Sequence, residues 1–225
     1  MRMPVHPSAG KIYSLLRRRF GFRNWWPGET RTEIAVGAIL TQQTSWRNVE
    51  KAIKGLKGEG LLDLDKIASC RTPKLERVIH PSGFYRQKAA RLKRFSTFVK
   101  TGYGTLDKFL AVEAARLRVE LLSINGIGPE TADSIILYAA GKPSFVVDAY
   151  TRREMSRIYG LEKEPDYGTL KAHFESNVRR SVKLYKDMHA QFVELGKAYC
   201  KPRPLCKECP LVKLCRYPSK SVQFN

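Results

Sequence analysis

Four cysteines near the C-terminal end of the chain have the spacing of a metal site. They follow the pattern C-x5-C-x2-C-x5-C and are Cys200, Cys206, Cys209 and Cys215. Four thiolates placed this closely can bind one tetrahedral zinc ion or an iron-sulfur cluster. Two disulfides are the alternative, which the lack of a recognisable signal peptide disfavours. The segment 200–215 is therefore predicted to be a metal-binding loop, with the choice between zinc and iron-sulfur left open by spacing alone.

A second candidate is the glycine-containing turn in LLSINGIGPETADSII. Gly126 and Gly128 lie between two segments with helical spacing, where they allow a sharp turn and let backbone N–H groups approach a phosphate. The second helix is expected to begin near Pro129, and its free N–H groups favour an anion. A purely structural connection between two helices is the alternative.

Asp148 is the third candidate, because it follows the apolar run 145–147 and precedes an expected helix. The simple interpretation is a helix N-cap, for which aspartate is a favoured residue. This structural role is compatible with a catalytic one. A carboxylate held at a helix start could activate water, or stabilise the positive charge that develops when an N-glycosidic bond breaks.

Helices are the elements that must position these groups. Strand-like alternation is scarce. Apolar residues recur at helical spacing in the segments 34–40, 49–56, 75–79, 89–99, 111–122, 151–159, 169–177 and 184–199. Glycine and proline separate these segments, so short turns are expected between helices of ordinary length. The fold is predicted to be all-α.

The chain is strongly basic, with 41 Lys and Arg against 21 Asp and Glu and a formal charge of +20. Basic residues cluster at 17–19 and at 86–94, which suits contact with a polyanion. A merely solvated surface is the alternative. No apolar run is long enough to span a membrane, so we expect a cytoplasmic protein that does not bind membranes.

Several segments together resemble one family. INGIGPETA, VVDAY, the four-cysteine cluster, ILTQQTSW at 39–46 and SGFYRQKAARL at 82–92 resemble the endonuclease III-like, helix-hairpin-helix superfamily of base-excision DNA glycosylases. WWPG, GAILTQQTSW, GFY and GIGPETA resemble its 3-methyladenine DNA glycosylase III branch in particular. That branch can lack the cysteine cluster, which this chain has.

The resemblance implies a two-lobed, all-α glycosylase fold with a C-terminal iron-sulfur loop. One lobe is a six-helix domain at 30–140 that includes the hairpin at 121–131. The other combines 1–29 with 141–225 and carries Asp148 and the cluster at 200–215. The implied cofactor is a 4Fe-4S cluster rather than zinc, although the five residues between the first two cysteines differ from the six that are common in the family. The implied partner is double-stranded DNA with a damaged or mismatched base, bound by a monomer associated with the nucleoid.

The resemblance also assigns roles to single residues. Gln43 matches the residue that fills the space left by an extruded base, and extrusion is needed because the glycosidic carbon is inaccessible inside the stack. Further DNA contacts are expected from the hairpin and from two basic residues, namely Gly126, Gly128, Thr131, Arg86 and Lys88.

Glu130 is an informative departure from the family pattern. Bifunctional members carry there a lysine that attacks the sugar and forms a Schiff base, which a carboxylate cannot do. The sequence thus favours a monofunctional enzyme that uses water assisted by Asp148. Adenine-specific relatives share a run similar to 42–44, but Ala38 occupies the place of their general acid.

The released base is expected to be an alkylated purine such as 3-methyladenine. Aromatic faces can sandwich an extruded base, and a cationic base gains from cation-π attraction. The expected base pocket consists of Trp25, Trp26, Trp46 and Glu130. Alternatives are a mismatch thymine or uracil glycosylase, an oxidised-base glycosylase with or without AP lyase activity, and a DNA-binding clamp without enzymatic activity.

Overall fold

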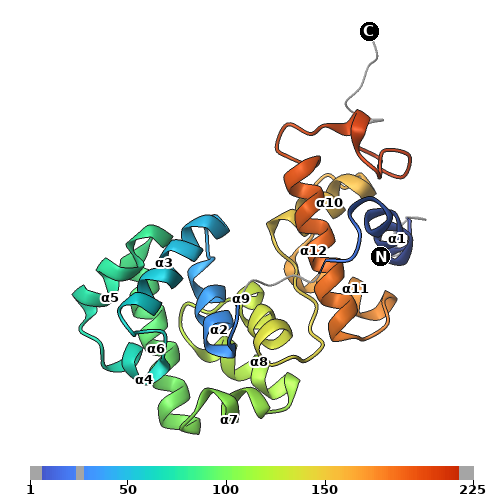
Figure 1. Cartoon of the computed structure of the whole chain (residues 1–225). Coiled ribbons are helices and arrows are strands. Elements are labelled where there is room, and N and C mark those ends of the chain that lie inside the picture. Colours follow the sequence, from blue (N-terminus) through green and yellow to red (C-terminus); the bar gives the residue numbers. More distant parts are fainter. Residues whose placement is uncertain (1–6, 24–27, 218–225) are drawn as a thin grey trace. The chain divides into compact units, whose positions relative to one another are not determined.

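Helices form the regular structure of the chain (Figure 1). The computed structural model describes residues 7–23 and 28–217, and no strand occurs within these two ranges. The all-α class expected from the apolar spacing is confirmed for this part of the chain. None of the helices in these ranges combines the length and the apolar character needed to cross a bilayer.

The chain divides into two compact units. The central unit comprises residues 26–144, and the terminal unit combines residues 1–25 with residues 145–225. The lobes implied by the resemblance, 30–140 and 1–29 plus 141–225, have slightly different boundaries. Each unit is described by itself below.

Eight α-helices occur in the described part of the central unit. They are α2 (Arg31–Leu40), α3 (Trp46–Gly58), α4 (Leu64–Ser69), α5 (Thr72–Ile79), α6 (Tyr85–Tyr103), α7 (Leu106–Ala111), α8 (Ala114–Ser123) and α9 (Pro129–Ser134). Six helices were expected, and the difference comes from short helices that have caps of their own. Asp63 accepts the backbone N–H of Lys66 at 3.0 Å at the start of α4, which is a standard N-cap.

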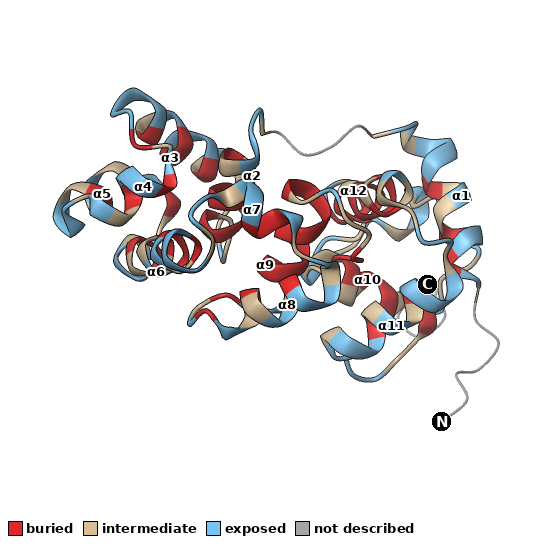
Figure 2. Cartoon of the chain, turned by 90° about the horizontal axis from the view of Figure 1, so that it is seen from below, coloured by how far each residue is buried: buried red, intermediate tan, exposed pale blue. Residues whose placement is uncertain are grey.

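Helix α2 lies at the centre of this unit. Every residue from Ala35 to Leu40 is buried (Figure 2), and the helix packs on α3, α6 and η2. η2 (Ile135–Ala139) is a π-helical continuation of α9. The turn that follows α2 and the hairpin that precedes α9 are therefore attached to one apolar core.

The terminal unit is built around α12 (Val182–Ala198), which packs against α1 (Ala9–Phe20) and α10 (Ala149–Tyr159). Helices from the two ends of the chain thus lie side by side (Figure 1). The ring of Phe145 stacks on that of Phe174 in α11 (Tyr167–Asn177), with 4.1 Å between ring centroids. This packing fixes the segment that leads into α10 and Asp148.

Candidate functional site

Asp148 caps the N-terminus of α10 and faces α12. Its Oδ1 accepts hydrogen bonds from the backbone N–H and the hydroxyl of Thr151, at 2.7 and 2.8 Å. Its Oδ2 lies 3.5 Å from Nε2 of His189, a buried residue of α12. The predicted helix cap is thus present, and it has a second neighbour that can carry a positive charge.

The carboxyl group of Asp148 is held in its ionised form. Burial by itself raises the pKa of a carboxyl group, yet the pKa of Asp148 is lowered, because His189 and Thr151 stabilise the anion. The side chain is 13% exposed, so it keeps limited access to its surroundings. A fixed carboxylate of this kind can stabilise a nearby positive charge or orient a water molecule.

Glu154, further along α10, is a second acidic residue that the sequence analysis did not single out. It is completely buried, and neither carboxyl oxygen has a hydrogen-bond partner among the described residues. Burial, with Cys200 and Asp148 nearby, raises the pKa of Glu154 well above its ordinary value. The two acids of α10 therefore differ, because Asp148 is an anion under conditions where Glu154 keeps its proton.

Replacing Glu154 with glutamine is expected to stabilise the protein increasingly as the pH rises. The unfolded chain loses this proton at a pKa of about 4.3, whereas the folded chain retains it to higher pH. Each pH unit between the two pKa values costs the parent about 1.4 kcal/mol of folding free energy, and glutamine does not titrate. Thermal unfolding midpoints measured from pH 5 to 8 test this, with Glu162→Gln in an exposed loop as control. Parallel pH curves for Glu154→Gln and the parent would contradict it.

The predicted hairpin is present between α8 and α9. Gly126 has φ of +95°, and a Cβ there would lie 2.6 Å from Cγ of Arg91, so glycine is needed both for the turn and for the close approach. Gly128 is the N-cap of α9, and a Cβ there would meet no atom within 4 Å. Thr131, expected to contact DNA, is instead buried and accepts a hydrogen bond from Gln42 at 2.9 Å. The exposed residues of the turn and of the start of α9 are Asn125, Gly128, Pro129 and Glu130.

A pocket lies beside the hairpin. It is lined by Gln42, Gln43, Phe84, Gln87, Lys88, Arg91, Gly126 and Glu130. Among the described residues, Gln43 and Phe84 are the only non-glycine residues with positive φ, at +53° and +45°. Such backbone conformations are uncommon and concentrate at functional sites. Phe84 is also 56% exposed, so the pocket presents one large apolar side chain among polar ones.

Phe84 was not assigned a role from the sequence, although GFY was among the segments that carry the resemblance. Apart from that segment, its place between Gly83 and the first residue of α6 gives no signal in the sequence. An exposed aromatic ring beside Gln43 can stack on bases, which is worth about 1–3 kcal/mol per base. Phe84 is therefore a candidate for stacking on bases next to an extruded nucleotide.

Replacing Phe84 with alanine is expected to slow base release by about tenfold to a hundredfold, as the loss of one base-stacking contact implies. Because the ring is exposed, the thermal unfolding midpoint should hardly change. Single-turnover release from a lesion duplex measures the effect. Phe22→Ala, at another exposed phenylalanine of the chain, is the matched control. Equal rates for Phe84→Ala and the parent would exclude a role for this ring.

The basic run at 86–94 is largely used inside the protein. Lys88 was expected to contact DNA, but it is completely buried, and its Nζ donates to the carbonyl of Ser82 at 2.6 Å. Burial, with a smaller contribution from Arg91, lowers the pKa of Lys88 to about 8. Arg86 is exposed and lies over the ring of Tyr85. Of the two expected basic DNA contacts, Arg86 is accessible and Lys88 is not, because the turn before α6 closes over it.

The residues expected to form a base pocket are not brought together in the described part of the chain. Trp46 lines a pocket with Glu33, Glu50, Ile53, Lys54 and Lys57. Glu130 lines a different pocket, the one with Gln43. Trp25 and Trp26 lie outside the described residues.

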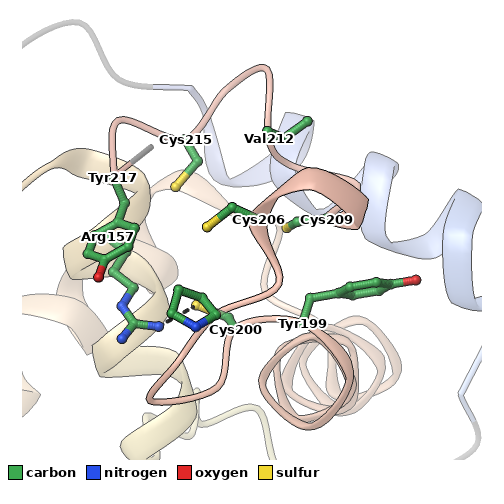
Figure 3. A pocket seen from close by; sticks show the side chains of 9 residues that line it. Arg157, Tyr199, Cys200, Cys206, Cys209, Val212, Cys215 and Tyr217 are labelled. Carbon is green, nitrogen blue, oxygen red and sulfur yellow. Dashed lines mark hydrogen bonds between the residues drawn. The ribbon is translucent and has the colours of Figure 1, made fainter. Parts of the chain in front are cut away.

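All four candidate cysteine ligands line one cavity of the terminal unit (Figure 3). Tyr199, Pro204, Val212 and Tyr217 also line it. Nη1 of Arg157 donates a hydrogen bond to Sγ of Cys200 at 3.3 Å, drawn as a dashed line in Figure 3. The fold thus brings together cysteines that the sequence placed only by spacing.

The chemistry of this cavity suits a metal-containing group. Burial raises the pKa of Cys209 and Cys215 to about 11, so these thiols keep their protons at neutral pH unless a cation replaces them. Within the described residues, no three cysteine, histidine or acidic side chains are placed to hold a single ion. Four thiols around one space are a ligand set that can bind either a zinc ion or an iron-sulfur cluster.

Comparisons with known proteins identify the family of the chain. The family profile described as HhH-GPD superfamily base excision DNA repair protein matches residues 36–180. A Methanocaldococcus jannaschii protein named "Putative DNA repair glycosylase MJ1434" is 47% identical over 91% of this chain and 94% of its own length. Endonuclease III of Thermotoga maritima is 28% identical over 82% of each chain. The crystal structure of H. pylori 3-methyladenine DNA glycosylase bound to 1,N6-ethenoadenine has a TM-score of 0.76 and 30% identity, covering 85% of this chain and 98% of that one.

Proposed function

The chain belongs to the HhH-GPD superfamily of base excision DNA repair proteins and is a DNA glycosylase, and we propose that it is monofunctional and releases an alkylated purine such as 3-methyladenine from duplex DNA. The observation that carries the proposed base is the similarity to an H. pylori 3-methyladenine DNA glycosylase that binds an ethenoadenine. The observation that carries the monofunctional reaction is Glu130, an exposed carboxylate at the start of α9.

Asp148 is the proposed catalytic carboxylate. When the N-glycosidic bond breaks, the sugar acquires oxocarbenium-like positive charge, which a fixed anion stabilises. The hydrogen bonds from Thr151 hold the carboxylate in place, and its lowered pKa keeps it ionised. Water is the proposed nucleophile, and Asp148 orients it.

Gln43 and Phe84 are proposed to support extrusion of the base. Glycosylases take the target nucleotide out of the stack, and the space that it leaves must be filled. Both residues are exposed, line one pocket and have an uncommon backbone conformation. Glu130 lines the same pocket, where bifunctional relatives carry the nucleophilic lysine.

A covalent trap tests the monofunctional mechanism. Borohydride reduction of a reaction on a substrate duplex should give no protein-DNA adduct, because a carboxylate cannot form the imine that borohydride reduces. Glu130→Lys serves as the comparison, since it restores an amine at this position. A strong adduct with the parent protein would show that another lysine acts as nucleophile.

The proposed base pocket includes Trp46. Trp46 lines a pocket with two acidic and two basic residues, Glu33, Glu50, Lys54 and Lys57, of which Lys57 pairs with Glu33 at 3.0 Å. An aromatic face attracts a cationic ring, and the attraction is about 0.5–2 kcal/mol depending on exposure. Alkylation makes purines such as 3-methyladenine cationic in DNA, so the indole face of Trp46 favours them over neutral bases.

We further propose that Cys200, Cys206, Cys209 and Cys215 hold a 4Fe-4S cluster. All four thiols line one cavity, and thiolates are the usual ligands of such clusters. The cluster would supply structural cross-linking of the loop 200–215, which carries several basic side chains. Base release itself depends on Asp148.

A panel of duplexes, each with one defined lesion, tests the proposed specificity. The released base is identified by mass spectrometry for alkylated purines, uracil or thymine opposite guanine, and oxidised bases. Release of 3-methyladenine or ethenoadenine supports the proposal, and Trp46→Ala should then reduce that release. Release of thymine or uracil alone would overturn the alkylated base, and no release from any duplex would favour a DNA-binding clamp.

A further inference from the structure

Gln42 joins three elements of the central unit through one side chain. Its Nε2 donates two hydrogen bonds, to the carbonyl of Gly126 at 3.0 Å and to the hydroxyl of Thr131 at 2.9 Å. Its Oε1 accepts a hydrogen bond from the guanidinium of Arg91. The turn after α2, the hairpin and α6 are therefore connected at this residue.

Arg91 also packs directly on the hairpin. The stem of its side chain occupies the space where any Cβ at position 126 would lie, at 2.6 Å from Cγ. One turn further along α6, Nε of Arg94 donates to the carbonyl of Asn125 at 3.1 Å. Arg91 and Arg94, which belong to the basic run that the sequence suggested for phosphate contact, thus contact the hairpin instead.

The residue after Gln42 is the one with an uncommon backbone conformation. Gln43 has φ of +53°; a non-glycine residue in this region costs about 1–3 kcal/mol and persists only when its surroundings hold it there. The turn has its own backbone hydrogen bond, from Thr44 N–H to the carbonyl of Thr41 at 3.2 Å. The side-chain bonds of Gln42 add a restraint from two distant segments.

We propose that Arg91 and Gln42 form a positioning clamp that holds Gln43 in its inserting conformation and links it to the hairpin. Binding of a DNA phosphate at the hairpin and entry of Gln43 into the duplex then occur together, because the two segments move as one body. Arg91 is a positioning residue, and it acts through Gln42 rather than on the base. The inference rests on the proposed role of Gln43.

Arg91→Met tests the clamp, because it keeps the apolar stem over Gly126 and removes the guanidinium. The probe is a duplex with 2-aminopurine opposite a tetrahydrofuran abasic analogue, whose fluorescence reports insertion without any base release. Arg91→Met should bind this duplex with nearly parental affinity and lose most of the fluorescence change at saturation. On a duplex with ethenoadenine, base release should slow on the order of a hundredfold, as misplacement of a positioned group does.

A double-mutant cycle separates positioning from a general structural role. In a Gln43→Ala background, Arg91→Met should cause no further loss, because the residue through which the clamp acts is gone. Gln42→Glu keeps the acceptor for Arg91 but removes both donors to the hairpin, so an intermediate loss is expected. Lys100→Met is the control and should behave as the parent, because Lys100 lies on α6 like Arg91 but pairs only at the surface, with Asp65 of α4.

Two results would overturn the clamp. If Arg91→Met weakens duplex binding while the fluorescence change at saturation stays intact, Arg91 is a phosphate contact. If the losses from Arg91→Met and Gln43→Ala add fully, Arg91 does not act through Gln43. Failure of the proposed function gives a different pattern, because a parent that releases no base can still show the fluorescence change and its dependence on Arg91.

Discussion

Replacing Asp148 with asparagine is expected to reduce base release by about a thousandfold, in the range reported for loss of one general acid–base or electrostatic group, while duplex affinity stays unchanged. Asparagine retains an oxygen that can accept the N–H of Thr151, and it caps helices about as well as aspartate. The variant therefore removes the negative charge with little change in the helix. Single-turnover release and equilibrium binding on one lesion duplex measure the two quantities.

Asp166 offers a matched control for this variant. It caps α11 in the same way, accepting the backbone N–H and the hydroxyl of Thr169 at 2.9 and 2.6 Å. Asp166→Asn should leave base release at the parental rate. If both variants lose activity equally, the effect at Asp148 comes from helix capping rather than from the charge.

The pH dependence gives a second check on Asp148. Since its pKa is lowered from the ordinary value, the carboxylate stays ionised below the pH at which a free aspartate takes up a proton. Base release that requires this anion should be lost only as the pH falls through the lowered pKa. A carboxyl group that must be protonated to act would show the opposite trend, with faster release toward acid pH.

Replacing Cys209 with serine is expected to abolish binding of the proposed 4Fe-4S cluster. A hydroxyl is a poor substitute for a soft thiolate ligand, and Cys209 is one of four thiols around a single cavity. Loss of iron and sulfide from the purified protein, loss of visible absorption, and faster hydrogen exchange in the segment 200–215 are the expected observations. A large drop in the thermal unfolding midpoint should accompany them, because metal binding and folding of such loops are coupled.

Cys70 is the matched control for this variant, because it is the fifth cysteine and belongs to the central unit. Cys70→Ser should retain the parental metal content and absorption. A protein in which Cys209→Ser still binds iron fully, or a parent that contains zinc alone, would contradict the proposed cluster.

Much of the site could be predicted from local sequence. The glycines at 126 and 128 with Pro129 predicted the hairpin, and the structure has α9 beginning at Pro129. Asp148 was predicted both as a helix cap and as a candidate carboxylate, and the cap is confirmed. These features depend on residues within a few positions of one another, which is the range over which turns and caps are formed.

Other parts of the site could not be predicted in this way. Glu154 reads as an ordinary polar residue of a helix, and only packing in the terminal unit deprives both of its oxygens of partners. Phe84 stands out only when its left-handed conformation and its exposure are known. The basic run at 86–94 indicated phosphate contacts, but Lys88 is buried beneath the turn that precedes its helix.

The sequence by itself determined the helical class of the protein and its family. It also identified Asp148 as the acidic residue at the start of α10 and the four cysteines that line one cavity. Residue types, their spacing and their order along the chain are sufficient for these conclusions. Only the tertiary structure decided which charges are available to a ligand and which are used internally. Arg91, Gln42 and Gly126 are far apart in the sequence and meet in one hydrogen-bonded group, because burial and pairing depend on segments that only the folded core brings together.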